Sequence, residues 1–182
     1  MTHSQSLDAK SRIEAAIRDI PNFPKEGILF KDLTPLLQDP ALCREEATLS
    51  AAPFLDKKID AVVGLESRGF WFGPLIAQQL NAAFIPMRKS GKLPGPTYGI
   101  EYDLEYGTAS IELQQDALNG HENILIHDDV LATGGTALAA YKLLQLAGKY
   151  AVGFSFVLEL DFLQGRKFLT STNTPIYSII NT

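Results

Sequence analysis

The sequence holds one cysteine, three histidines and no long apolar run, and each scarcity excludes a class of protein. Cys43 alone cannot form a disulfide framework or a thiolate metal cluster. His3, His121 and His127 do not follow the spacing of a zinc site. No apolar stretch approaches the ~20 residues of a membrane-spanning helix, and the charged N-terminal segment lacks a secretory apolar core. We therefore expect a soluble cytoplasmic protein.

Two phosphate-binding motifs and an excess of positive charge are also absent. Neither G-x-x-x-x-G-K-[ST] nor G-x-G-x-x-G occurs, which argues against a nucleoside-triphosphate P-loop and against a dinucleotide fold. A formal net charge of −5 gives no overall attraction to nucleic acid or anionic membranes, so neither is an expected partner. With 182 residues and 46% hydrophobic residues, the composition fits one globular domain, 1–182.

Apolar runs alternate with helical patterns along most of the chain. Near-continuous apolar runs are typical of parallel strands buried on both faces, so we predict an α/β fold with a mainly parallel central sheet flanked by helices. The predicted strands are 28–30, 59–65, 82–88, 123–127, 151–160 and 176–180. The predicted helices are 7–19, 39–52, 70–80 and one that follows the 123–127 strand and ends before Gly148.

The segment 89–116 differs from the rest of the chain. Its stretch KSGKLPGPTYGIEYDLEYGTASIEL is rich in glycine, proline and tyrosine, which favours a loop and hairpin over another strand–helix unit. A long insertion of this kind in a compact α/β domain is often an active-site lid.

The stretch NILIHDDVLATGGTALAAYKLL, residues 123–144, has the pattern of a phosphate site. In an open parallel sheet, ligands gather where strands end and helices begin. Gly134 and Gly135 let backbone N–H groups approach a ligand, while Thr133 and Thr136 add hydroxyl donors beside the positive end of the next helix. The pattern predicts a pocket for one phosphate dianion.

Asp128 and Asp129 precede this pocket, where two carboxylates would repel a phosphate unless they serve another part of the ligand. Vicinal ribose hydroxyls could donate to them, or a Mg²⁺ ion held through water could offset their charge. The implied ligand is a ribose 5-phosphate unit.

Five segments are similar, in unbroken order over residues 20–166, to motifs of the type I phosphoribosyltransferase family, and to its adenine phosphoribosyltransferases in particular. These segments are FPKEGILFKDLTPLL, GLESRGFWFGPLIA, MRKSGKLPGPT, EYDLEYGTASIEL and HDDVLATGGTA. His127 stands where the family usually has an aliphatic residue, but this leaves the acids and the loop intact. The resemblance implies a single phosphoribosyltransferase domain with an N-terminal helix and base-binding hood, 1–36, and a flexible lid loop or hairpin, 88–113.

The reaction that this resemblance implies is adenine + 5-phosphoribosyl pyrophosphate ⇌ AMP + pyrophosphate, a step of purine salvage. Ribose 5-phosphate would be bound by Asp128, Asp129, Ala132, Thr133, Gly134, Gly135 and Thr136. Pyrophosphate would be bound by Glu66, Ser67, Arg68, Arg88, Lys92 and Tyr106. The catalytic residues would be Arg68 and Glu105, with Glu105 handling the proton of the base.

Adenine would lie under the hood, against Leu29, Phe30, Lys31 and Val130. A backbone C=O and N–H can match the amino donor and N1 acceptor of adenine, whereas a 6-oxopurine presents the reverse pattern. The family often has arginine where Lys31 stands, so the charge is kept and the bidentate fork is lost. The resemblance further implies a homodimer and Mg²⁺ carried by phosphoribosyl pyrophosphate, with no direct protein ligand and a possible water bridge to Asp128.

Three other functions remain open on the sequence. The enzyme could use hypoxanthine, guanine or xanthine, although the hood and LEYG motifs favour adenine. The chain could be a regulator that binds phosphoribosyl pyrophosphate and contacts nucleic acid. Such a protein should carry a DNA-binding extension or a basic face, whereas here we expect a single short N-terminal helix and the charge balance is acidic. It could also be an inactive subunit, against which stand the intact Arg68, Glu105, Asp128 and Asp129.

Overall fold

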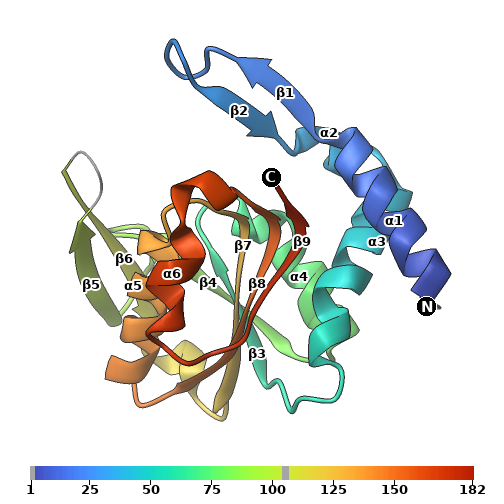
Figure 1. The fold of residues 1–182 in the computed structure, drawn as a ribbon. Coiled ribbons are helices and arrows are strands. Elements are labelled where there is room, and N and C mark those ends of the chain that lie inside the picture. Colours follow the sequence, from blue (N-terminus) through green and yellow to red (C-terminus); the bar gives the residue numbers. More distant parts are fainter. Residues whose placement is uncertain (1–2, 104–106) are drawn as a thin grey trace.

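The protein is built on one large sheet, seen in a computed structural model that describes residues 3–103 and 107–182. Within these residues the sheet has seven strands in the order β5-β6-β4-β3-β7-β8-β9 (Figure 1). They are β3 (Ala61–Leu65), β4 (Ala83–Lys89), β5 (Thr97–Asp103), β6 (Thr108–Gln114), β7 (Asn123–Leu131), β8 (Tyr150–Glu159) and β9 (Ile176–Asn181).

Most of the sheet is parallel. Strands β4, β3, β7, β8 and β9 run parallel to one another, whereas β6 lies antiparallel to β4, and β5 antiparallel to β6. The hairpin predicted within 89–116 is therefore present and extends one edge of the sheet. The predicted α/β class with a mainly parallel sheet is confirmed.

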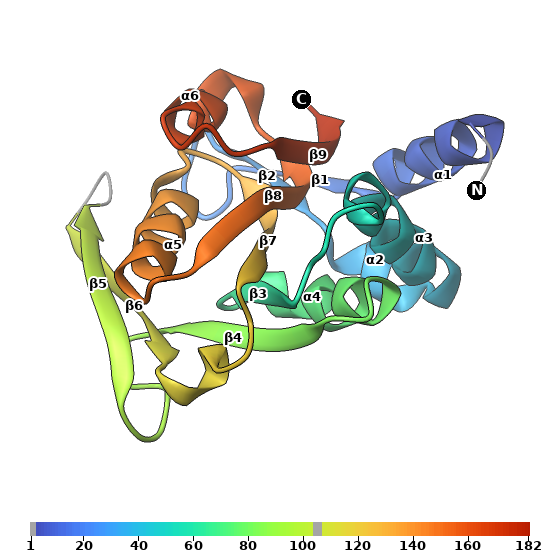
Figure 2. The ribbon, with the colours of Figure 1, turned by 90° about the horizontal axis from the view of Figure 1, so that it is seen from below.

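Helices cover both faces of the sheet (Figure 2). One face packs against α1 (His3–Ala16), α2 (Thr34–Gln38), α3 (Pro40–Ala51) and α4 (Gly69–Gln79), and the other against α5 (Gly135–Leu146) and α6 (Gly165–Thr170). Short 3-10 turns occupy Ala52–Phe54, Asp116–Leu118 and Asp161–Leu163. Each face has its own buried apolar cluster, so β3, β7 and β8 are covered on both sides. In the described part of the chain, no helix is long and apolar enough to cross a membrane.

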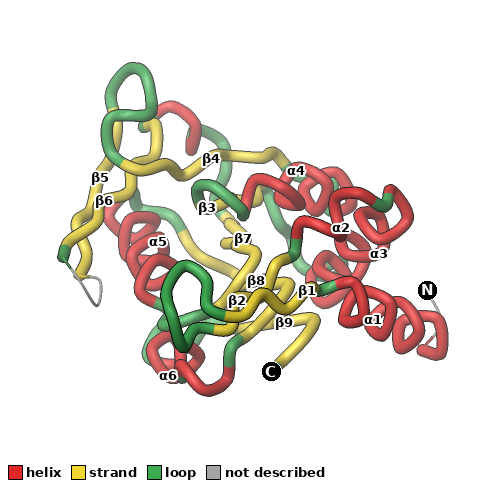
Figure 3. Tube along the Cα trace, turned by 90° about the horizontal axis from the view of Figure 1, so that it is seen from above, coloured by secondary structure: helices red, strands yellow, loops and turns green. Residues whose placement is uncertain are grey.

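The N-terminal segment ends in a separate two-stranded sheet. Strand β1 (Arg18–Pro21) pairs antiparallel with β2 (Leu29–Asp32), and seen from above this hairpin lies across the carboxyl end of the main sheet (Figure 3). The predicted helix 7–19 was wrong at both ends, because the helix spans His3–Ala16 and Arg18 joins the hairpin. An ion pair of 2.6 Å from Arg18 Nη2 to Asp32 Oδ2 accompanies this pairing.

Strand β7 is longer than predicted. The apolar run suggested an end at His127, but the ladder with β8 continues through Asp128↔Phe156 and Leu131↔Glu159. Backbone pairing with an already long neighbour extends the strand past two acidic residues that local propensity disfavours. The two aspartates therefore stand in a strand and not in a loop. Helix α6 was not predicted, nor was α2.

Candidate functional site

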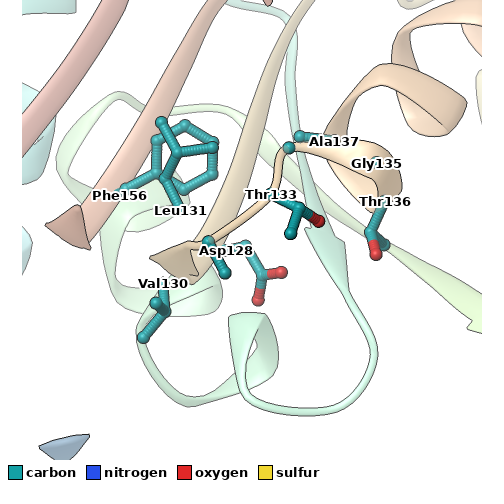
Figure 4. Close-up of a pocket in the computed structure, with 10 residues that line it drawn as sticks. Asp128, Val130, Leu131, Thr133, Gly135, Thr136, Ala137 and Phe156 are labelled. Carbon is teal, nitrogen blue, oxygen red and sulfur yellow. The ribbon is translucent and has the colours of Figure 1, made fainter. Parts of the chain in front are cut away.

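The predicted phosphate loop lies between the end of β7 and the start of α5. Gly134 is the N-cap residue of α5 and has φ +83°, a left-handed conformation that favours glycine. No side chain caps the helix, so its first N–H groups are free of a side-chain acceptor. A small pocket of about 70 Å³ opens here, lined by Asp128, Val130, Leu131, Ala132, Thr133, Gly134, Gly135, Thr136, Ala137 and Phe156 (Figure 4).

The size and lining of this pocket suit a small anion. Pockets for whole drug-sized ligands span roughly 300–1,000 Å³, so this one matches a single group of a larger ligand. Positive charge from the N-terminal end of α5 and the hydroxyls of Thr133 and Thr136 face it. Every residue that the sequence predicted for the phosphate loop, 132–136, lines the pocket.

A tyrosine that the sequence reasoning missed reaches this loop from the β5–β6 hairpin. The hydroxyl of Tyr102 lies 3.2 Å from Oγ1 of Thr136, at hydrogen-bond distance. Tyr102 is half-buried and packs beside α5. The sequence marked Tyr102 only as a member of the EYDLEYG motif, in which we predicted roles for Glu105 and Tyr106 alone.

The two acids point in different directions, as neighbours in a strand do. Asp128 is half-buried and lines the phosphate pocket, where its carboxylate lies on the same side of the loop as the Thr133 and Thr136 hydroxyls (Figure 4). Asp129 is buried, and its Oδ2 lies 3.0 Å from Nε of Arg68 at the start of α4. The backbone N–H of Asp129 donates to Oδ1 of Asp128 at 2.9 Å.

Burial makes this acid pair reluctant to carry two negative charges. Desolvation, then the neighbouring charge of Asp129, raise the pKa of Asp128 well above its ordinary value. Desolvation also raises the pKa of Asp129, and the Arg68 guanidinium partly offsets this. Among the described residues, Oδ2 of Asp129 accepts no hydrogen bond of good geometry, and Arg68 Nε at 3.0 Å gives it an ion-pair contact only. Hydroxyl donors or a cation brought by a ligand would therefore stabilise the ionised pair.

Arg68 joins the acid pair to the N-terminal hairpin. Its guanidinium carbon lies 5.5 Å from the ring centroid of Phe30, within cation–π range, while its Nε faces Asp129. Phe30 also packs edge-on against Phe23, at 5.1 Å between ring centroids. The hairpin therefore contacts the loop that follows β3, and Phe30, Arg68 and Asp129 form a connected series.

Glu66 and Arg88 form a second ion pair at the carboxyl ends of β3 and β4. Nε and Nη2 of Arg88 each donate to a different carboxylate oxygen of Glu66, both at 3.2 Å, and the Lys89 N–H donates to Oε2 at 2.9 Å. Burial alone would raise the pKa of Glu66, but these donors outweigh it and the pKa lies below its usual value. The backbone C=O of Lys92 accepts a bond from Arg88 Nη1 at 3.2 Å.

The remaining residues predicted for the adenine and pyrophosphate sites do not form a single cluster. Leu29 is 51% exposed, and Lys31 pairs with Asp19 at 2.8 Å. Ser67 and the Lys92 side chain are exposed. Glu105 and Tyr106 lie outside the described residues, so the structure does not place the predicted proton-handling group.

His127 and Glu46 are buried polar residues away from the phosphate pocket. Nδ1 of His127 donates to the Ser155 carbonyl at 3.1 Å, because a carbonyl can only accept, and burial lowers the pKa of His127 to about 4. Glu46 is fully buried, accepts from Ser50 Oγ at 2.7 Å, and has its pKa raised by burial to about 8. Among the described residues, no acid forms a hydrogen bond with His127 that would orient a catalytic imidazole.

Comparison with known proteins places this arrangement in a family. Residues 33–160 match the family model described as "Phosphoribosyl transferase domain". The adenine phosphoribosyltransferase of Crocosphaera subtropica is 50% identical over 93% of this chain and 98% of its own length.

Solved structures of the same family share the fold of this chain. The adenine phosphoribosyltransferase of Rhodothermus marinus has a TM-score of 0.90 at 45% identity, over 97% of this chain and 99% of that one. The Saccharomyces cerevisiae enzyme, solved with adenine and an imino-altritol bisphosphate, has a TM-score of 0.88 at 40% identity, over 95% and 99%. A fold, a phosphate loop and a sequence shared over almost the whole chain leave one conclusion: the chain belongs to the adenine phosphoribosyltransferase family, whose reaction converts adenine and phosphoribosyl pyrophosphate to AMP.

Proposed function

We propose that the pocket at the end of β7 holds the 5-phosphate of phosphoribosyl pyrophosphate during transfer of its ribosyl group to adenine. The observation that carries this proposal is the uncapped N-terminus of α5 behind a left-handed Gly134, with Asp128 beside it. Residues 132–136 bind the phosphate, and Asp128 and Asp129 accept hydrogen bonds from the ribose hydroxyls. Their negative charge also stabilises the positive charge that develops on the anomeric carbon.

Pyrophosphate lies at the carboxyl ends of β3 and β4 in this proposal. Arg68 and Arg88 supply planar donor forks, and the Ser67 and Lys92 side chains are exposed and free to turn toward an anion. Glu66 acts by fixing the guanidinium of Arg88, because both of its oxygens already accept from it. Arg68 exchanges part of its contact with Asp129 and Phe30 for the leaving group.

The base stacks between Phe30 and Val130. Phe30 sits on the hairpin that reaches the β3–α4 loop, and Val130 is half-buried at the edge of the pocket. The backbone around Leu29 presents the donor and acceptor that match adenine, and Lys31, held by Asp19, adds positive charge nearby. The solved Saccharomyces cerevisiae relative, which contains adenine, supports a 6-aminopurine. In this proposal Glu105 handles the proton of the base and Tyr106 binds pyrophosphate.

Mg²⁺ enters this proposal with the substrate. The described residues include no group of three or more His, Cys, Asp or Glu side chains that could hold a metal. Asp128 lines the pocket, and its pKa is raised because burial and Asp129 disfavour its charge. A cation held through water would offset this, so Asp128 fits a water-bridged contact to an ion bound chiefly by pyrophosphate oxygens. When bound, the ion would neutralise charge on the leaving group.

We further propose that the chain works in the cytoplasm as a homodimer, and as a single catalytic unit in which residues 1–36 form the hood and 88–113 the lid. The hood proposal rests on the contact between Phe30 and Arg68, and the lid proposal on the hydrogen bond between Tyr102 and Thr136. Light scattering of the purified chain tests the dimer.

The function is tested by AMP formation from phosphoribosyl pyrophosphate and Mg²⁺, with adenine, hypoxanthine, guanine and xanthine in parallel. We expect turnover of adenine alone, and a fall of about 10²-fold or more in kcat for Glu105→Ala, the range of general acid–base catalysis. Glu122→Ala, a surface glutamate that pairs with Lys149, is the matched control and should keep full activity.

Other outcomes separate the parts of the proposal. Turnover of an oxopurine would overturn the base site and leave the phosphate pocket standing. Full activity in Glu105→Ala would remove the proton-handling role. Tight binding of phosphoribosyl pyrophosphate without turnover of any base would favour a regulator or an inactive subunit.

A further inference from the structure

The phosphate loop is in direct backbone contact with the first residue of α6. A Cβ placed on Gly165 would lie 2.1 Å from the carbonyl oxygen of Ala132 and 3.0 Å from the nitrogen of Gly134. A Cβ placed on Gly134 would lie 2.7 Å from the carbonyl oxygen of Gly165. The two backbones therefore touch where neither residue has a side chain.

Helix α6 is held in this place by a partly buried ion pair. Arg166 donates through Nε to Oε1 of Glu159 at 2.8 Å and through Nη2 to Oε2, and Ser178 Oγ adds a bond to Oε2 at 2.7 Å. Glu159 is 3% exposed, and its neighbour across the ladder is Leu131, the residue before the phosphate loop. Nη1 of Arg166 donates to the Ile176 carbonyl at 3.1 Å. The guanidinium thus fastens α6 to β8 and β9.

Two further contacts fix the helix from the side of α5. Leu169 is fully buried in the apolar cluster that contains the α5 side chains, and the Tyr141 hydroxyl donates to the Thr172 carbonyl at 3.4 Å. Figures 1, 2 and 3 all show α6 beside α5 at the carboxyl end of the sheet. Helix α6 is therefore held against the sheet and against α5, the helix that follows the phosphate loop.

We propose that Gly165, held by the Glu159–Arg166 ion pair, is a positioning residue for the 5-phosphate loop. A loop that binds phosphate through backbone N–H groups works best when those groups are fixed before the ligand arrives. Gly165 fixes them by backbone contact, and the contact needs glycine because a methyl group would displace Ala132. The inference rests on the proposed phosphate pocket and adds residues that never touch the ligand.

The test compares two ligands that differ only in the phosphate. Affinities for AMP and for adenosine are measured by titration calorimetry on the full chain, and their ratio reports the phosphate contribution. We expect Gly165→Ala to lower this ratio about 10- to 100-fold, since a displacement of ~1 Å in a site can cost ~10²-fold. Adenosine affinity should stay unchanged. Lys167→Ala, exposed on the same helix, is the control and should keep the wild-type ratio.

Arg166→Lys is the second variant, because it keeps the positive charge and loses the two-pronged contact with Glu159. We expect a smaller fall in the same ratio. A folded Gly165→Ala with the wild-type ratio overturns the inference. Should that variant not fold, an unchanged ratio in Arg166→Lys overturns it. If the wild type itself does not prefer AMP over adenosine, the phosphate pocket fails, and this inference fails with it.

Discussion

At the scale of single residues, the hydrogen bond between Tyr102 and Thr136 can set the direction of one hydroxyl proton. A threonine hydroxyl has one proton to donate and two lone pairs to accept with. If Tyr102 donates to Oγ1 of Thr136 across their 3.2 Å, the Thr136 proton is free to donate to a phosphate dianion. The tyrosine would then orient a phosphate donor without contacting the phosphate.

Removing the tyrosine hydroxyl should therefore weaken phosphate-bearing substrates alone. We expect Tyr102→Phe to raise KM for phosphoribosyl pyrophosphate about 2- to 10-fold, which corresponds to one hydrogen bond of about 0.5–1.5 kcal/mol. KM for adenine should not change. Steady-state kinetics with each substrate varied in turn give both values, and Tyr150→Phe, 71% exposed, is the control. An equal rise in both KM values would point to a general disturbance of the site instead.

At the scale of elements, two glycines with the same left-handed conformation have different surroundings. Gly134 has φ +83°, and a methyl carbon added to it would lie 2.7 Å from the backbone oxygen of Gly165. Gly148, at the end of the same helix α5, has φ +71° and nothing within 4 Å of such a methyl carbon. An alanine at either position meets the conformational cost, but only at Gly134 does it also meet the Gly165 carbonyl.

The pair of alanine variants separates these two costs. We expect Gly148→Ala to lower the free energy of unfolding by about 1–2 kcal/mol, the cost of a left-handed non-glycine residue. Gly134→Ala should lose more, and should lose AMP binding as well. Urea denaturation and AMP titration measure the two quantities. Equal losses of stability, with AMP binding retained, would show that the close contact between the loop and α6 is not tight.

Sequence patterns located most elements but not all of their ends. The helix α3 start at Pro40 was predictable because Asp39 accepts from the Ala41 N–H, a local signal. The end of β7 was missed because it depends on pairing with β8, which lies 28 residues further along the chain at Asp128↔Phe156. Strand β1 was missed because it shows as a strand only through its hairpin with β2. The phosphate loop was predictable because its residues form one contiguous motif. Gly165 was not predictable, because it meets that loop only through the tertiary fold and the sequence around it has no recognisable motif.

At the scale of the whole molecule, two buried residues link stability to pH in opposite directions. Glu46 has a folded pKa of about 8 against 4.5 for the free side chain, so the folded state binds its proton more tightly. Its contribution to stability is complete below pH 4.5 and is lost as pH rises through 8. His127 has a folded pKa of about 4 against 6.5, so its contribution is complete above pH 6.5 and is lost as pH falls through 4.

These two contributions predict where the protein is most stable. Between about pH 4.5 and 6.5 the opposing slopes cancel, so Glu46 and His127 together give a flat maximum there. Above pH 6.5 only the Glu46 slope remains, because His127 is then neutral in both states.

Glu46→Gln isolates the Glu46 slope, because the amide keeps the shape, can still accept from Ser50 and cannot ionise. We expect the wild type to lose about 1.6 kcal/mol relative to this variant between pH 6.5 and 8. One proton corresponds to about 1.4 kcal/mol per pH unit, and this slope falls to half as the pH reaches the folded pKa of about 8. Urea denaturation of both proteins at each pH gives the difference, in which other titrating groups cancel. Ser50→Ala leaves the carboxyl in place and without its donor, so it should keep the pH slope that Glu46→Gln removes. A difference between wild type and Glu46→Gln that stays constant over this range would mean that Glu46 has the same pKa in the folded and unfolded chains, and that water reaches a carboxyl group which the packing of α3 encloses.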